Sequence, residues 1–150
     1  AMAAAAGGGG LGEETFLSNA EVCILLTSQK TKREANGLRT TEVFDKTLEA
    51  TRRFAGISEP QKPGMVVYVQ ELRQQLTVME FQKESEIDPG SLEMHRLTPF
   101  EVAQFSNLMP ENPEEAFALM DGLSARFEHD DIQQVCDICD KIRTNTQLLA

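Results

Sequence analysis

The sequence predicts an all-α protein. Three segments carry the pattern of a helix start, in which a capping side chain is followed three residues later by a glutamate; they begin at Ser18, Thr98 and Asn112. Between these starts, apolar residues recur at helical spacing. The alternating apolar and polar runs are too short to predict a sheet.

The composition indicates one domain, or one domain with an arm, in 150 residues of net charge −10. An acidic chain binds free nucleic acid poorly, because phosphate neutralisation needs clustered Lys and Arg. Three cysteines are too few for a disulfide framework and favour a reducing compartment, and no apolar run reaches the length of a membrane span. Residues 1–16, rich in Ala and Gly, lack a signal-peptide pattern, and we expect a disordered leader there.

Residues 17–56 are expected to form two helices. The first follows the Ser18 cap and contains five consecutive apolar residues, 22–26, whereas a surface helix needs only one apolar stripe. A helix that is apolar on all sides is buried on all sides. Two interpretations follow: the run is a central helix or strand of this chain's own core, or another polypeptide covers part of it.

A turn at Asn36-Gly37 is expected to separate the first helix from a second, which starts at Thr40 or Thr41. Gly56 is placed to end this second helix. One face of the helix combines Phe44, Thr47, Leu48, Thr51 and Ala55.

Residues 57–96 are expected to hold a linker, a long helix and an insertion. Pro60 and Pro63 mark the linker, and Asp88-Pro89-Gly90 breaks the helix before the next segment. The helix carries an apolar seam with spacings of 4, 3, 4 and 3 residues, which favours packing against a helical core: Met65, Val69, Leu72, Leu76 and Met79.

Residues 97–143 are expected to form a small helical module, followed by a tail at 144–150. Thr98, Pro99 and Glu101 specify a capping box, with Leu97 and Val102 as its hydrophobic staple. Asn112, Pro113 and Glu115 repeat the arrangement, and Gly122 fits the end of that second helix. A final helix runs from about Glu128 into the low 140s, with an inner face of Ile132, Val135, Cys136, Cys139 and Ile142.

Residue patterns that suggest catalysis are weak. Cys136 and Cys139 form a C-x-x-C pair, but zinc needs further ligands at set spacings, and only Cys23, His95 and His129 remain. His129-Asp130-Asp131 more simply complements a helix dipole. We therefore expect neither an enzyme nor a metal or cofactor site. The basic residues between Lys30 and Arg53 favour a solvated surface over contact with RNA or an acidic partner.

The order of several segments resembles the RNA polymerase stalk subunit family, most closely the form that is the fourth subunit of RNA polymerase II. Its relatives are the stalk equivalents in RNA polymerase III and in the archaeal RNA polymerase. The resemblance rests on residues 18–26, 43–54, 97–120 and 126–135. Residues 97–120 resemble the family's C-terminal module, which is similar to the domain shared by RecQ helicases and ribonuclease D. The stretch 82–96 has no counterpart in the family pattern and is interpreted as an insertion.

This resemblance implies a non-catalytic nuclear subunit. It would form a heterodimer with the S1/OB-fold stalk subunit, the seventh subunit of RNA polymerase II or its paralogue. It would then dock on the polymerase core, act in initiation and meet nascent RNA through the heterodimer, with no membrane partner. The alternatives are the equivalent RNA polymerase III subunit and, in another class, a free nucleic-acid-binding helical module. The residues expected to bind the partner are Leu17, Val22, Leu25, Leu26, Phe44 and Leu48.

Overall fold

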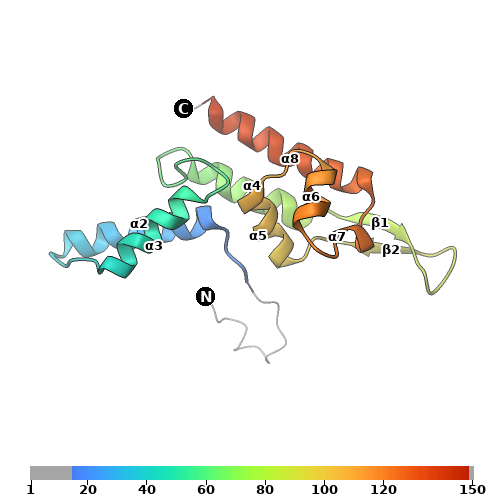
Figure 1. Cartoon of the computed structure of the whole chain (residues 1–150), viewed down its shortest axis with the longest axis horizontal. Helices are drawn as coiled ribbons and strands as arrows, with labels where there is room; N and C mark the ends of the chain where they lie inside the picture. The colour runs from blue at the N-terminus through green and yellow to red at the C-terminus, as the bar shows by residue number, and fades with distance from the viewer. Residues whose placement is uncertain (1–14, 149–150) are drawn as a thin grey trace.

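The computed structural model describes residues 15–148, which form seven helices and one two-stranded hairpin. In chain order the elements are α2 (Asn19–Ala35), α3 (Glu42–Arg53), α4 (Val66–Val78), β1 (Phe81–Glu84), β2 (Leu92–His95), α5 (Pro99–Leu108), α6 (Pro113–Leu119), α7 (Leu123–Arg126) and α8 (His129–Gln147). The predicted all-α class is confirmed (Figure 1). Most of the expected leader, residues 1–14, lies outside the described residues.

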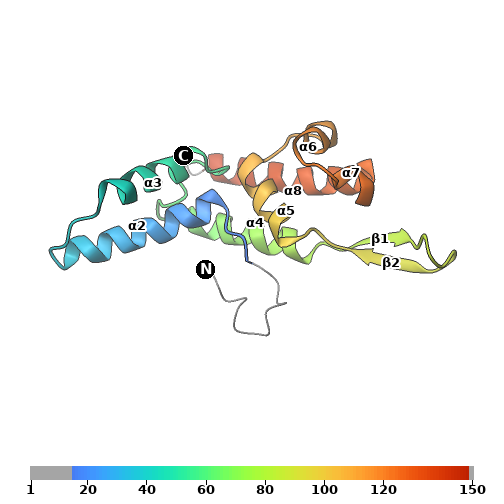
Figure 2. The same ribbon diagram turned by 60° about the horizontal axis from the view of Figure 1, so that its bottom comes forward.

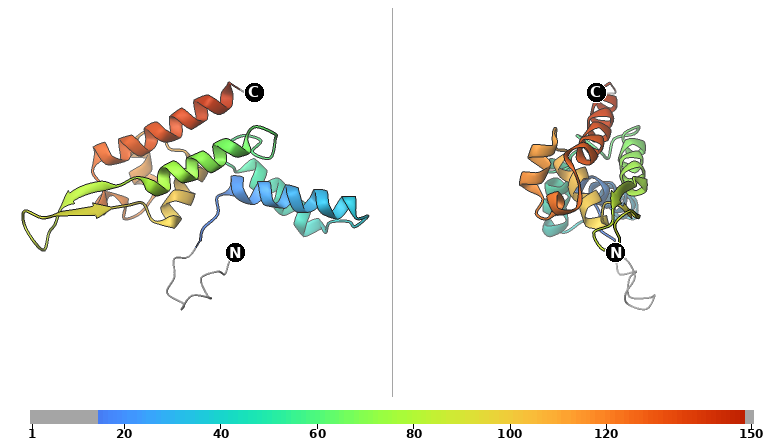
Figure 3. Two further views of the ribbon diagram at one scale, coloured as in Figure 1. Left: turned by 180° about the vertical axis from the view of Figure 1, so that it is seen from behind. Right: turned by 90° about the vertical axis from the view of Figure 1, so that its right-hand side faces the viewer.

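The described part is elongated, with a helical body between two projecting arms (Figure 1). In the body, α4 packs against both α5 and α8, and α6 packs against α8. One arm is the antiparallel pair α2–α3, and the other is the hairpin β1–β2, which leaves the opposite end of the body (Figure 2). The two arms again point in opposite directions when the molecule is seen from behind (Figure 3).

Capping interactions fix where α2 and α3 begin. The Ser18 hydroxyl accepts a hydrogen bond from the Glu21 amide at 3.3 Å, and the Glu21 carboxylate accepts one from the Ser18 amide at 2.9 Å, which is the predicted capping box. Thr41 caps α3 by accepting a hydrogen bond from the Phe44 amide at 3.1 Å. Between the helices, Gly37 adopts a φ of 73°, a left-handed conformation that suits glycine.

The apolar run 22–26 is only partly buried within this chain. Of its residues only Cys23 is buried, whereas Leu25 is 51% exposed. The partner helix α3 has no buried residue. The interpretation of this run as a central core element is therefore wrong, because only one side of α2 packs on this chain: Ile24 lies against the core cluster and α2 contacts α4 and α5, whereas Leu25 stays exposed.

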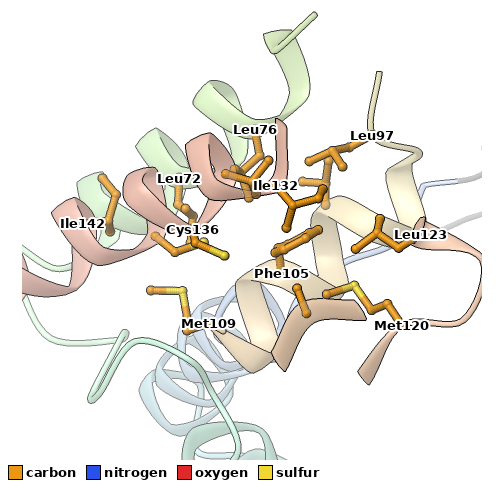
Figure 4. Close-up of a cluster of buried hydrophobic side chains, with 14 of the residues drawn as sticks. Leu72, Leu76, Leu97, Phe105, Met109, Met120, Leu123, Ile132, Cys136 and Ile142 are labelled. Atoms are coloured by element: carbon orange, nitrogen blue, oxygen red, sulfur yellow. The ribbon is translucent and has the colours of Figure 1, made fainter. Parts of the chain in front are cut away.

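The apolar seam of α4 lies in the core, as predicted. Met65, Val69, Leu72 and Leu76 are buried, and Met79 packs against the same cluster. Figure 4 shows Leu72 and Leu76 facing Ile132 and Cys136 of α8, with Phe105 of α5 beneath them.

The insertion at 82–96 forms a β-hairpin that the sequence did not predict. β1 and β2 pair antiparallel, with Phe81 opposite His95 and Glu84 opposite Leu92. The Phe81 ring anchors the hairpin, because it packs edge-on against Phe127 with 5.4 Å between the ring centroids. Each strand has only four residues, so its alternation is too short to identify in advance.

The predicted helix starts at Thr98 and Asn112 are confirmed, with one difference. Thr98 and Glu101 form both hydrogen bonds of the capping box, at 3.1 and 2.8 Å. Asn112 accepts from the Glu115 amide at 2.9 Å, but the Glu115 carboxylate accepts from the Glu111 amide at 3.3 Å. The cap of α6 is therefore a single Asn interaction without the reciprocal bond.

The C-terminal part holds one helix more than expected and a longer final helix. Gly122, at φ 81°, precedes the short helix α7 and does not directly end α6. α8 begins after Glu128 as predicted and continues to Gln147, beyond the expected end in the low 140s. Thr146 near its end is buried, so the last turn still packs on the body. The predicted inner face of α8 is confirmed as buried: Ile132, Val135, Cys136, Cys139 and Ile142.

Candidate partner-binding surface

One apolar side of α3 is occupied by α2. Phe44 and Leu48, two of the residues predicted to bind a partner, are half-buried. Thr51 lies seven residues after Phe44, on the same side of the helix, and its hydroxyl reaches the Cys23 thiol of α2. Phe44 and Leu48 therefore support the contact between α2 and α3, which leaves only part of their surface for a partner.

A second apolar side of α3 is open. It lines a shallow groove together with Asn19 of α2, and the lining residues recur on α3 at helical spacing: Val43, Lys46, Thr47, Ala50, Thr51 and Phe54. Val43 is 75% exposed and Phe54 is 63% exposed. Large apolar side chains gathered in this way on a projecting arm indicate an interaction site.

The open side continues onto α2. Val22 and Leu26 follow Asn19 at i+3 and i+7, on the same side of α2 as this groove residue, although the groove lining itself does not include them. Both are half-buried, and Leu25, three residues from Val22, is more exposed. Leu17 is also exposed and directly precedes the Ser18 cap. We call the following set the α2–α3 apolar face: Val22, Leu25, Leu26, Val43, Ala50 and Phe54.

Val43, Ala50 and Phe54 were not predicted from the sequence. The prediction followed the stripe from Phe44 to Ala55, which is the side that α2 occupies. The second stripe has spacings of 4, 3 and 4 residues when Thr47 is included, so the signal was present. Thr47 is assigned from the sequence to the stripe of Phe44 and Ala55, so this second stripe is not recognised there.

Polar contacts fix the root of the α2–α3 arm on the body. The Asn19 amide donates to Asn107 Oδ1 of α5 at 2.8 Å, and Asn19 Nδ2 donates to the Phe54 carbonyl at 3.2 Å. Gly56 approaches α5 so closely that an added Cβ would lie 2.0 Å from the Ser106 carbonyl oxygen. These contacts hold the arm, and with it the α2–α3 apolar face, in one orientation relative to the body.

A partly buried ion pair ties the start of α2 to α4. Arg73 Nη2 donates to Glu21 Oε1 and to the Phe16 carbonyl, each at 2.6 Å. Burial raises the pKa of the Glu21 carboxyl, but hydrogen bonds from Arg73 and Ser18 outweigh it, so the pKa is lowered overall. Glu21 therefore remains an anion in the folded protein, and Arg73 joins three segments by bonding both Glu21 and the Phe16 carbonyl: residue 16, α2 and α4.

Basic side chains gather near the tip of the α2–α3 arm. Lys30 and Lys46 form ion pairs with Asp45 and Glu42, at 3.7 and 2.9 Å. Lys32, Arg33 and Arg39 are exposed and make no ion pair within residues 15–148. A partner seated on the apolar face would thus meet a positively charged border in an otherwise acidic chain.

The cysteine pair of α8 has the properties of core residues. Burial raises the pKa of the Cys136 thiol to about 11 and that of the Cys139 thiol to about 12. Raised thiol pKa values disfavour the thiolate, which is the form that metal binding and redox exchange require. Nor does any group of three or more His, Cys, Asp and Glu side chains within residues 15–148 have the arrangement of a metal site.

His129 and His95 each lie beside a carboxylate. His129 Nε2 lies 2.8 Å from Glu114 Oε1, and His95 Nε2 lies 3.5 Å from Glu93 Oε2. Neither histidine lies beside a hydroxyl or thiol nucleophile in these contacts. No helix in the described part of the chain is long and apolar enough to cross a membrane.

The surface features thus point to binding, and a family match agrees. Residues 16–143 match the family described as RNA polymerase Rpb4, which covers both the α2–α3 arm and the helical body. The match includes the β-hairpin segment and ends within α8. The chain belongs to the RNA polymerase Rpb4 family, whose members are non-catalytic stalk subunits of RNA polymerase.

Proposed function

We propose that the α2–α3 apolar face binds the S1/OB-fold stalk subunit, and that the two chains form the stalk heterodimer. The observation that carries this proposal is the apolar stripe of Val43, Ala50 and Phe54 on the α2–α3 arm, which lies open in the described part of the chain. A stalk subunit acts by assembly, so an uncovered apolar face is the feature to expect where its partner binds.

The apolar area, charge and rigidity of the α2–α3 arm support a specific interface with this partner. Val43 and Phe54 supply apolar area, and burial of each exposed side chain contributes about 1.5–3 kcal/mol. The basic border of Lys32, Arg33 and Arg39 favours an acidic rim on the partner, which would set its orientation. The root contacts of Asn19 preorganise the arm, which lowers the entropic cost of binding.

We further propose that the heterodimer serves RNA polymerase II in the nucleus, docks on the polymerase core, acts in initiation and meets nascent RNA. The resemblance of residues 43–54 and 126–135 to the polymerase II form supports this assignment. The resemblance of residues 17–22 to the polymerase III form supports the alternative. Affinity purification of the tagged chain, followed by identification of the largest co-purifying subunit, decides between the two polymerases.

A pair of matched substitutions tests the interface. Val43 and Val67 are each the second residue of a helix, α3 and α4, and are 75% and 56% exposed. An aspartate is compatible with folding at both positions, because acidic residues suit the first turn of a helix. Val43→Asp is expected to abolish co-purification with the S1/OB-fold subunit, since the interface would bury an unpaired charge, whereas Val67→Asp retains it.

The opposite outcome would refute the interface. Retention of the S1/OB-fold subunit by Val43→Asp, Leu25→Asp and Phe54→Ser alike would show that the partner binds elsewhere. The rival function is a free nucleic-acid-binding module, which the basic tip of the α2–α3 arm favours. A salt-dependent gel shift of the isolated chain at near-physiological salt, lost when Lys32, Arg33 and Arg39 are replaced by glutamine, would support the rival.

A further inference from the structure

The two faces of the β1–β2 hairpin differ. The inner face meets the body: Phe81 packs on Phe127, and Lys83 Nζ lies 3.6 Å from Glu128 Oε1. Side chains alternate along a strand, so the neighbouring positions point away from the body. The outer face accordingly presents four exposed side chains, two from each strand: Gln82, Glu84, Leu92 and Met94.

The outer edge of β2 has free backbone groups. The Ser85 amide donates to the Ser91 carbonyl at 2.9 Å, so residues 85 and 91 form a hydrogen-bonded pair of the ladder. Hydrogen-bonded and non-hydrogen-bonded pairs alternate, which assigns Leu92 and Met94 to non-hydrogen-bonded pairs. Their amide and carbonyl groups therefore point away from β1, and within residues 15–148 no other element bonds to them.

This edge is short, which limits strand pairing, but it carries no lysine or proline and no covering segment within residues 15–148. Natural sheet edges are commonly guarded by lysine, proline or a covering segment. β2 instead has Leu92, 66% exposed, and Met94 beside its free backbone groups. A partner strand would gain main-chain hydrogen bonds and two apolar contacts at the same place.

The turn end of the hairpin is acidic. Glu84, Glu86 and Asp88 are exposed and form no ion pair within residues 15–148. The charged side chains of the inner face, in contrast, have partners: Lys83 pairs with Glu128, and Glu93 lies beside His95. Glu84 and Glu86 line a pocket with Lys83, His95 and Arg126, and Asp88 lies between the strands, so a segment along β2 meets these carboxylates near the turn end of the hairpin.

We propose that the edge of β2 binds an extended, basic segment of a partner protein, which adds a third strand beside Leu92 and Met94. Lysine or arginine side chains of that segment would pair with Glu84, Glu86 and Asp88, and its apolar residues would cover Leu92 and Met94. This surface lies at the opposite end of the body from the α2–α3 apolar face (Figure 2). The proposal does not depend on the identity of the partner at that other face.

Photo-cross-linking tests the proposal in the assembled polymerase. A photoreactive amino acid replaces either Met94 or Gln82 in the tagged full-length chain, which is then purified with its polymerase. Both positions lie on the outer face, and they are opposite each other in the ladder, but their backbone groups point to opposite edges. Position 94 is expected to cross-link to one Lys- and Arg-rich protein segment, at least about tenfold more than position 82.

A proline pair tests strand addition directly. Met94→Pro removes only an outward amide, which an edge strand tolerates, and Gln82→Pro does the same at the other edge. For this test the photoreactive amino acid replaces Leu92. The yield of its cross-linked product is expected to fall about tenfold when Met94→Pro is added and to persist when Gln82→Pro is added. Equal cross-linking from positions 82 and 94, no cross-linking from either, or a product with an acidic segment, RNA or a second copy of this chain would overturn the proposal.

Discussion

Arg73 of α4 completes the cap of α2 through Glu21, with Nη2 of the guanidinium 2.6 Å from Oε1 of the carboxylate. The same carboxylate accepts from the Ser18 amide at 2.9 Å. One side chain thus satisfies a helix end and pairs a charge on another helix. The orientation of the α2–α3 arm therefore depends on an interaction between residues 52 positions apart in the sequence.

Glu21→Gln is expected to destabilise the fold by about 1.5 kcal/mol at neutral pH, because glutamine can still cap α2 but loses the charged bond to Arg73. The pKa of Glu21 is lowered in the folded state, so its contribution is present above the unfolded value of 4.5 and is lost as the pH falls through the folded pKa. Urea unfolding should show a gap between wild type and variant at pH 7 that shrinks at pH 3. An equal gap at both pH values would contradict this account.

Thr98→Ala and Asn112→Ala are each expected to lower the free energy of unfolding by about 1 kcal/mol. Each removes the side-chain acceptor for a backbone amide in the first turn of a helix, α5 for Thr98 and α6 for Asn112. Thermal unfolding measures the loss. Glu115→Ala should cost less than Glu101→Ala, since only Glu101 completes a capping box and also binds Arg126, at 2.7 Å. The reverse order would show that the two caps are not built as described.

Gly56→Ala is expected to destabilise the chain by about 1–3 kcal/mol, because the added methyl would overlap the Ser106 carbonyl and the Met109 side chain. Gly37→Ala is the control: nothing lies near its Cβ position, so only its left-handed φ of 73° is penalised. Amide hydrogen exchange should distinguish the Gly56→Ala variant from the Gly37→Ala variant. Gly56→Ala speeds exchange in α5 and at the arm root, whereas Gly37→Ala affects only the tip of the arm.

Native-state labelling with a thiol reagent at pH 8 is expected to leave Cys136 and Cys139 unmodified. Both side chains are buried, and burial raises their pKa values to about 11 and about 12, so little thiolate forms. Both should react once urea unfolds the chain. Rapid labelling of either residue without denaturant would show that α8 detaches from the body in the native state.

Features encoded over a few neighbouring residues could be predicted from the sequence. The caps at Ser18 and Thr98 and the buried face of α8 depend on local spacing, and the structure has them where the pattern indicates. The β1–β2 hairpin and α7 could not be predicted, because four-residue elements are too short for periodicity to show.

The candidate surface was only partly predictable, for a different reason. An apolar run such as 22–26 specifies that cover is needed, but whether this chain provides it depends on which elements pack around it. Leu25 was identified because it belongs to that run. Val43 and Phe54 emerged only when the structure showed which side of α3 is taken by α2.

Helix α4 has a consequence for the two arms. Its start follows the arm root, it packs against α2, and its last residue, Val78, lies just before β1. Thirteen residues at 1.5 Å each make a rod of about 20 Å, on which every added residue would turn one end by about 100° relative to the other. Because Arg73 of α4 holds the start of α2 and the end of α4 leads into β1, the number of residues in α4 between these points contributes to the angle between the two arms.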